Sequence, residues 1–126
     1  MKIQYFLRII LAGVLLVFMN ACATTTARSG PAALAGTWTN SLGTVWTIKA
    51  DGTFEVVNPK RHIWGKYTIA GDTVTIQETG GKTAKGCKGP GTYKFSRPNE
   101  NTLTFTLVSD TCGERKKNVL LAWHQK

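Results

Sequence analysis

Residues 53–79 read TFEVVNPKRHIWGKYTIAGDTVTIQET, and this stretch decides the fold. Large apolar side chains alternate with polar ones in three short runs, at 53–58, 63–69 and 73–79. Alternation with a period of two is typical of strands that bury one face, and the segments NPKRH and AGD between the runs consist largely of turn residues. The stretch therefore predicts three consecutive antiparallel strands joined by short turns.

The same pattern continues in both directions from this stretch. No part of the chain from Gly36 onward sustains helical periodicity, so the sequence predicts an all-β domain. Two polar connections, 80–91 and 109–118, separate the later strands. Further strands are expected over 36–49 (interrupted at 42–43), 92–97, 103–107 and 119–124. Short sequential strands favour a small antiparallel up-and-down barrel of about eight strands, because closure removes the exposed edges.

The first residues of the chain have the pattern of an export signal. Lys2 and Arg8 stand before an apolar run over 9–18, which is shorter than the ~20 residues a spanning helix needs. The segment ends Met-Asn-Ala-Cys at Cys22, which resembles the lipobox of bacterial lipoproteins. That resemblance implies that Cys22 is acylated, with fatty acyl chains such as palmitate, and becomes the new N-terminus. The alternative is an ordinary signal peptide cut nearby, which would leave Cys22 as an odd thiol.

These features divide the chain into three parts. Residues 1–21 are expected to be a lipoprotein signal peptide, 22–35 a flexible tether and 36–126 the barrel domain. Ala23 after the cysteine favours sorting to the outer membrane if the lipoprotein rule applies. We therefore expect a protein of the cell envelope, anchored in the outer membrane by its lipid, with the domain in the periplasm.

The charge balance is strongly basic. The chain has 16 Lys and Arg against 7 Asp and Glu, a net charge of +9. Lys2 and Arg8 belong to the signal, so the mature chain carries two positive charges fewer. Such a field favours anionic neighbours, in the envelope anionic lipid headgroups or an envelope protein, although a solvated basic surface explains it equally well. No nucleic-acid-binding module is recognisable, and no nucleic acid is expected as a partner.

Cys87 and Cys112 form the remaining cysteine pair. In an exported protein we expect them to be joined by a disulfide, which would stabilise the domain by on the order of 3 kcal/mol. Two free buried thiols are the alternative. Neither cysteine has a histidine at metal-binding spacing, so no metal site and no cofactor are expected.

Residues able to perform catalysis are few. His62 lies in a basic turn and His124 near the C-terminus, and neither is part of a recognisable nucleophile motif. Asp110 and Glu114 flank Cys112 and are expected to accept hydrogen bonds in that loop or to balance charge. The sequence therefore predicts a protein that is not an enzyme.

The segment Leu34-Ala35-Gly36-Thr37-Trp38 resembles the Gly-x-Trp signature of the calycin barrels, the group that contains lipocalins and avidins. The resemblance implies that Trp38 plugs the closed end of a barrel and that an arginine packs across its ring. Arg115 is the expected partner, in a cation–π contact of about 1–2 kcal/mol. The last third of the chain, 91–123, also resembles small exported lipocalin-like domains of bacteria, which supports the fold and the cysteine pair.

The stretch from Gly36 to Thr44, with the residues at 51–54, is similar to the opening of avidins. In that family the residues matching Asn40 and Thr44 bind the ureido oxygen of biotin, and a tyrosine on the next strand completes the set. Asn58 stands at the tyrosine position here, so we interpret the likeness as shared barrel geometry.

The number of aromatic residues bears on binding. An eight-stranded barrel is either filled by side chains or leaves room for one small ligand. We expect a small apolar or amphiphilic ligand; the alternative is a protein-interaction module or hydrolase inhibitor that acts through the barrel loops. The candidate ligand-binding residues are Asn40, Thr44, Trp46, Trp64, Tyr67 and Tyr93.

Overall fold

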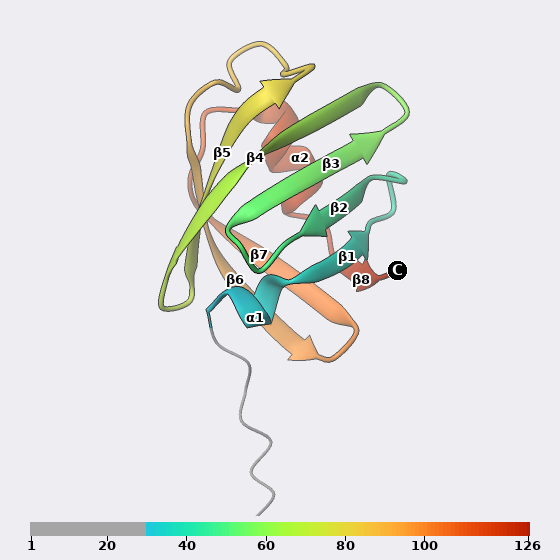
Figure 1. The fold of residues 1–126 in the computed structure, drawn as a ribbon, viewed down its shortest axis with the longest axis vertical. Coiled ribbons are helices and arrows are strands. Elements are labelled where there is room, and N and C mark those ends of the chain that lie inside the picture. Colours follow the sequence, from blue (N-terminus) through green and yellow to red (C-terminus); the bar gives the residue numbers. More distant parts are fainter. Residues whose placement is uncertain (1–29) are drawn as a thin grey trace, which may run out of the picture.

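The computed structural model describes residues 30–126, so Cys22 and most of the expected tether lie outside the described residues. Eight antiparallel strands form a closed barrel in sequence order, with the last strand paired to the first (Figure 1). This confirms the predicted up-and-down barrel. The strands are β1 Gly36–Thr39, β2 Val45–Ile48, β3 Thr53–Asn58, β4 Arg61–Ala70, β5 Thr73–Gly81, β6 Gly91–Asn99, β7 Thr102–Ser109 and β8 Trp123–Gln125.

Strand β4 shows how the alternating pattern becomes a barrel wall. Its buried residues recur at every second position, at Ile63, Gly65 and Tyr67, and the residues between them are exposed. Gly65 pairs with Phe54 of β3, and a Cβ atom on Gly65 would come within 2.7 Å of the Phe54 ring. The glycine therefore makes room for a phenylalanine in the barrel interior.

One continuous apolar core fills most of the barrel. Its aromatic side chains with the least exposure are Trp38, Tyr93 and Trp123, and Leu103 is equally buried, each at most 1% exposed. Close packing of this kind provides most of the stability of a small domain. The remaining core residues are Leu34, Trp46, Ile48, Phe54, Tyr67, Val74, Ile76, Phe105 and Val119.

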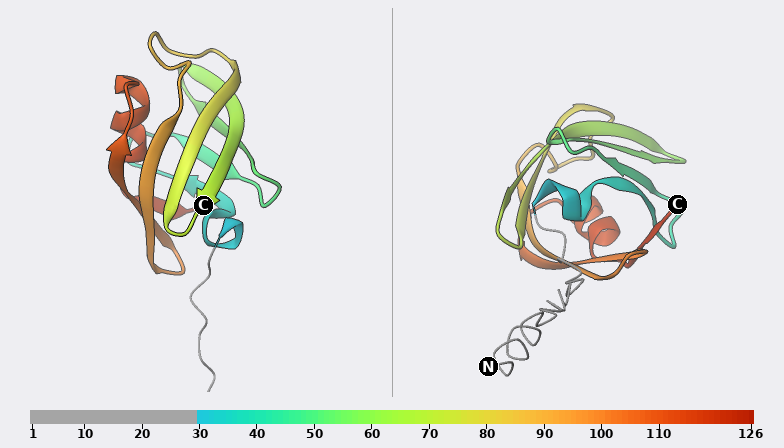
Figure 2. Two further views of the ribbon diagram at one scale, coloured as in Figure 1. Left: turned by 90° about the vertical axis from the view of Figure 1, so that its left-hand side faces the viewer. Right: turned by 60° about the horizontal axis from the view of Figure 1, so that its bottom comes forward.

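A one-turn helix, α1 (Pro31–Leu34), lies across one end of the barrel (Figures 1 and 2). Trp38 Nε1 donates a hydrogen bond of 2.9 Å to the Leu34 carbonyl oxygen, and the Leu34 side chain is buried in the core. The prediction that the tether continues to residue 35 is therefore wrong for 31–34. Leu34 is the only large apolar residue of that segment, and its burial orders the turn that Pro31 begins.

A second helix, α2 (Gly113–Val119), stands where the sequence predicted an irregular polar connection. Cys112 caps its N-terminus, and the Cys112 Sγ accepts a hydrogen bond from the Arg115 N–H at 3.2 Å. Glu114 in the first turn and lysines in the last turn complement the helix dipole. Seven residues are too few to show helical periodicity, which explains why the pattern did not reveal the helix.

The helix also changes the last strand. β8 begins at Trp123 rather than at Val119, because Val119 ends α2 and packs into the core. Among residues 30–126, no helix has the length and apolar character that a membrane crossing requires.

A candidate ligand cavity at the open end of the barrel

A cavity of about 100 Å³ lies inside the barrel, toward the end opposite α1. It is bordered by the β3–β4 turn, the β5–β6 loop and α2, and both an apolar and a polar set of side chains line it. The lining residues are Thr44, Trp46, Phe54, Val56, Asn58, Lys60, Arg61, Ile63, Ile76, Glu78, Ala84, Cys87, Cys112, Glu114, Arg115, Asn118, Val119 and Trp123.

Aromatic rings form the apolar part of the cavity lining. The ring centroid of Trp46 lies 5.1 Å from that of Trp123 and 6.1 Å from that of Phe54, in edge-to-face geometry. The Phe105 ring stacks on the Trp46 ring, with 5.4 Å between the ring centroids. Such contacts hold the rings in fixed positions, so this part of the cavity is a preformed apolar surface. Trp46 Nε1 is buried without a hydrogen-bond acceptor among the described residues.

Asn40 and Thr44 shape the β1–β2 loop at the cavity mouth. Asn40 Oδ1 accepts hydrogen bonds from the N–H groups of Leu42 and Thr44, at 3.0 and 3.2 Å. Thr44 Oγ1 donates to Asn118 Oδ1 at 2.6 Å, which joins the loop to α2. Asn40 therefore has a structural role and does not line the cavity, whereas Thr44 and Asn118 do.

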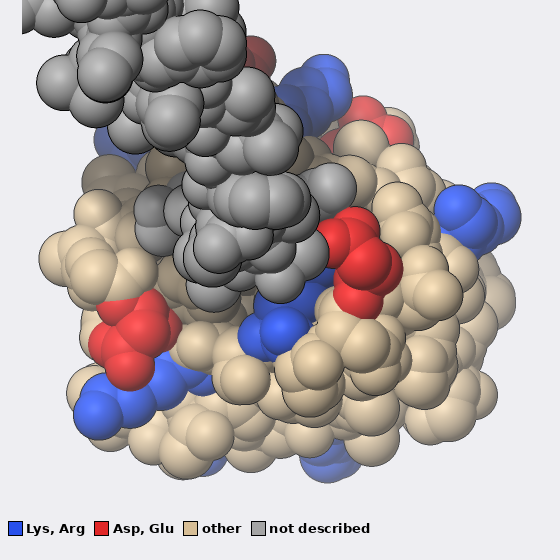
Figure 3. All heavy atoms as spheres, turned by 90° about the horizontal axis from the view of Figure 1, so that it is seen from below, with Lys and Arg blue, Asp and Glu red and all other residues tan. Residues whose placement is uncertain are grey.

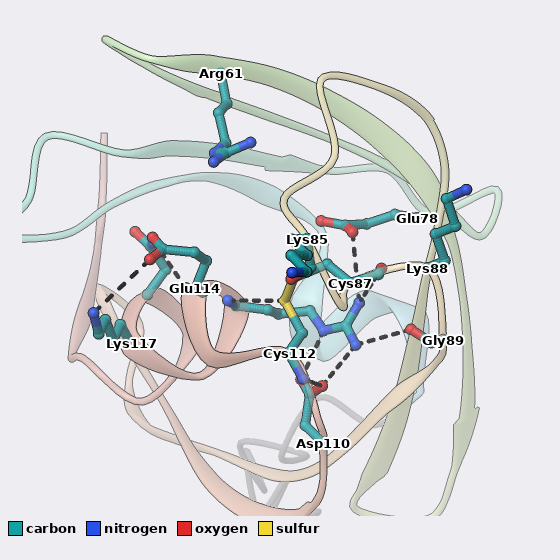
Figure 4. The surroundings of a disulfide bond; sticks show 12 residues. Arg61, Glu78, Lys85, Cys87, Lys88, Gly89, Asp110, Cys112, Glu114 and Lys117 are labelled. Atoms are coloured by element: carbon teal, nitrogen blue, oxygen red, sulfur yellow. Dashed lines mark hydrogen bonds and ion pairs between the residues drawn. A yellow bond between two sulfur atoms is a disulfide. The ribbon is translucent and has the colours of Figure 1, made fainter.

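A buried ion pair forms one side of the site (Figure 4). The Arg115 guanidinium donates to both carboxylate oxygens of Asp110, at 2.6 and 2.7 Å, and to the Gly89 carbonyl oxygen at 2.9 Å. Burial by itself raises the pKa of Asp110, but the hydrogen bonds from Arg115, Tyr93 and the Cys112 N–H outweigh it and hold that pKa below its usual value. The pair stays ionised and fixes the loop before α2.

Glu78 completes this network. Its side chain is only 8% exposed, and its Oε2 lies 3.8 Å from Arg115 Nη1 without accepting a hydrogen bond from any described residue. Burial raises the pKa of Glu78, and the positive charges of Arg115 and Arg61 oppose the rise only in part. Glu78 is therefore a weakly paired carboxyl group in the cavity wall.

The disulfide between Cys87 and Cys112 is confirmed. It joins the β5–β6 loop to Cys112, the residue that caps the N-terminus of α2 (Figure 4). Both cysteines line the cavity, so the covalent bond holds two of its walls together. Asp110 accepts a hydrogen bond from the Cys112 N–H at 2.8 Å, as expected of a loop carboxylate, whereas Glu114 lies 3.8 Å from Lys117.

The structure separates the six residues predicted to bind a ligand. Thr44 and Trp46 line the cavity. Tyr67 lies toward the closed end, where its hydroxyl group donates to the Lys49 carbonyl oxygen, and the hydroxyl group of Tyr93 donates to Asp110. Trp64 is 47% exposed on the outer surface, where its ring lies against Gly80.

The expected stack of Arg115 on Trp38 is wrong. Arg97 lies over the Trp38 ring instead, with its Cζ 5.0 Å from the ring centroid, and donates to the Ala33 carbonyl oxygen at 3.3 Å. Arg115 is held near the other end of the barrel by Asp110. The residue type was predicted correctly, but Arg97 on β6 is the arginine that reaches the closed end.

Sequence reasoning also missed the polar residues of the cavity. Asn58, Arg61 and Glu78 line it, and each continues the inward period-two series of its strand beyond the last large apolar residue. In β5, for example, Val74 and Ile76 are followed by Glu78. A polar residue at an inward-facing position of a strand is the sequence signal that could have identified these lining residues.

The fold and the cavity define a class: a small closed up-and-down β-barrel with one covered end and a partly polar cavity at the other. No protein-family model matches the chain. No curated protein and no solved structure matches it either. Within residues 30–126, no group of three His, Cys, Asp or Glu side chains is arranged to hold a metal ion.

Proposed function

We propose that this chain is a lipid-anchored, non-enzymatic protein of the bacterial cell envelope whose barrel binds the apolar end of a small amphiphile. The predicted export signal and its lipobox-like end at Cys22 support the location. The observation that carries the binding function is the cavity, because it combines an aromatic floor with a polar mouth. Pockets of that composition are typical of small-molecule sites.

The volume limits what enters. An apolar cavity of ~150 Å³ holds benzene, whereas drug-sized ligands occupy pockets of ~300–1,000 Å³. At about 100 Å³, this cavity has room for a group smaller than a benzene ring, such as the end of an acyl chain. The rest of the ligand would lie in the mouth and outside it, which is the arrangement an amphiphile requires.

The chemistry of the lining supports binding rather than catalysis. In the described part of the chain, no histidine or serine lines the cavity, and its two cysteines are joined to each other. Arg115 and Asp110 are engaged with each other and with the backbone. These groups hold the walls in place, and no hydroxyl, thiol or amine among the described lining residues donates a hydrogen bond to a carboxylate or a histidine.

The test compares two substitutions of half-buried apolar residues. Val56→Phe places a larger side chain in the cavity lining, and Ile69→Phe makes a similar change in β4 away from the cavity. Full chains with an affinity tag are purified from envelopes, and the small molecules that co-purify are identified by mass spectrometry after solvent extraction. We expect one amphiphile in the wild type and in Ile69→Phe, and at least a fivefold loss in Val56→Phe.

Equal recovery from all three proteins would contradict the proposal, as would no specific molecule with any of them. Trp64→Ala is an additional control for non-specific binding to an exposed aromatic ring, because Trp64 lies on the outer surface. Its recovery should equal that of the wild type. Circular dichroism and the melting temperature verify that each variant is folded.

A further inference from the structure

The net charge of the described domain is concentrated at the mouth of the cavity. Eight Lys and Arg but only two Asp and Glu occur in the segments that form this end, 40–44, 58–61, 82–90 and 110–119. The rest of residues 30–126 carries five of each sign. Counting Glu78 with the mouth lowers its excess by one and does not change the asymmetry. The opposite end shows acidic and basic side chains close together (Figure 3).

Several of these cations are free to interact with a ligand. Lys60 and Arg61 line the cavity itself. Arg61 Nη1 donates to the Lys82 carbonyl oxygen at 3.1 Å, which places the start of the β5–β6 loop beside it. Lys85 lies near the disulfide (Figure 4). We call Lys60, Arg61, Lys82 and Lys85 the basic rim; none of the four forms an ion pair within the described residues.

The carboxylates at the mouth are all engaged in ion pairs with cations outside the basic rim. Arg115 is neutralised by Asp110 and has Glu78 as a second counter-ion at 3.8 Å. Glu114 lies 3.8 Å from Lys117. The basic rim, together with Lys88 and Lys116, therefore leaves a net positive charge available to a ligand in the mouth.

We infer that the head group of the bound amphiphile is anionic, a carboxylate or a phosphate monoester, and that the basic rim binds it while the apolar end occupies the aromatic part of the cavity. This inference rests on the proposed function. Lysine and arginine bind such oxyanions by charge-assisted hydrogen bonds, and Arg61 presents a planar fork suited to them. The concentration of positive charge at one end also steers anions to the mouth.

The test uses four probes with the same tail: octanoate, octyl phosphate, octanol and octylammonium. The full chain is reconstituted in phosphatidylcholine nanodiscs and titrated calorimetrically, with empty discs subtracted. Anionic probes should bind at least about fivefold more tightly than octanol, and octylammonium more weakly than octanol, because two exposed charge contacts contribute on the order of 1 kcal/mol, or about fivefold. Whichever of octanoate and octyl phosphate binds more tightly indicates the chemistry of the natural head group.

A double variant locates the effect. Lys60→Gln with Arg61→Gln should raise the Kd of the anionic probes about fivefold and leave that of octanol within twofold. Lys49→Gln with Lys94→Gln removes the same charge away from the cavity and should change neither.

The outcomes separate the two proposals. Equal Kd values for octanoate, octanol and octylammonium would overturn the anionic head group and leave the binding function standing. No binding of any probe would contradict both. A loss of octanoate affinity as large in Lys49→Gln with Lys94→Gln as in the rim variant would also overturn the inference, because the effect would then follow net charge alone.

Discussion

Arg97 and Arg115 show how neighbouring structure assigns different roles to two identical side chains. Arg97 lies on the face of Trp38 at the closed end, with 10% of its side chain exposed. Arg115 is buried between two carboxylates beside the cavity. The first contact adds packing and a cation–π attraction, whereas the second compensates buried charge, and the two should differ in what their loss costs.

We predict that Arg97→Ala lowers the free energy of unfolding by about 1–2 kcal/mol and that Arg115→Ala lowers it by about 3–5 kcal/mol. The larger loss arises because Asp110 would be left buried without its partner. Urea denaturation at neutral pH measures both. Equal losses would contradict the roles assigned here.

Glu78 supplies a prediction about pH. Its pKa is raised in the folded protein, chiefly by burial, so the ionised form destabilises the fold. The contribution of Glu78 to stability should therefore fall as pH rises from the unfolded-state pKa of Glu, about 4.3, through the raised folded-state value.

The matched variant is Glu78→Gln, which is neutral at every pH. It should melt at a higher temperature than the wild type at pH 7, and the difference should disappear near pH 4, where Glu78 is protonated. Thermal unfolding by circular dichroism at both pH values provides the comparison. A Glu78→Gln protein less stable than the wild type at pH 7 would mean that the contact with Arg115 outweighs burial.

At the scale of elements, the sequence predicted the strands better than the connections. Alternation located β3 to β7, because each strand buries one face and the periodicity is local. Helix α2 was not predicted, because seven residues are too few to show a helical period. Its sequence signals are the N-cap residue Cys112, the acidic Glu114 in the first turn and the basic Lys117 in the last turn. The cavity could be predicted only in part. Trp46 was a candidate because the chain has many aromatic residues. Glu78 and Arg61 could have been found only by noting that polar residues continue the inward-facing series of their strands.

The disulfide joins two of these connections, the β5–β6 loop and α2. It closes a sequence separation of 25 residues, for which the chain-entropy treatment gives about 3.5 kcal/mol. We predict a loss of about that size in the free energy of unfolding for Cys87→Ala with Cys112→Ala. Urea denaturation of this variant and of the reduced wild type should agree. A loss below about 1 kcal/mol would show that the described contacts hold α2 without the covalent bond.

At the scale of the whole molecule, the described chain begins at the covered end of the barrel and the cavity lies toward the other end. Residue Cys22 is eight positions before Gly30, a distance of at most roughly 28 Å in extended chain. An acylated Cys22 would thus hold the covered end near a membrane and leave the mouth accessible.

The anchor is tested by labelling cells with an alkyne analogue of palmitate. We predict label on the wild type and on Cys87→Ala with Cys112→Ala, and none on Cys22→Ser. In-gel fluorescence after conjugation to a dye gives the readout. Label that persists in Cys22→Ser, or a wild type without label, would refute the lipoprotein assignment.

The central claim is that the apolar end of an amphiphile occupies the cavity between Trp46, Phe54 and Trp123. The most direct measurement is a crystal structure of the mature protein with 8-bromooctanoate, in which anomalous scattering locates the bromine atom. We predict one bromine peak among these three rings, with the carboxylate near Lys60 and Arg61. A bromine peak on the outer surface near Trp64, or an empty cavity at saturating probe, would contradict the account.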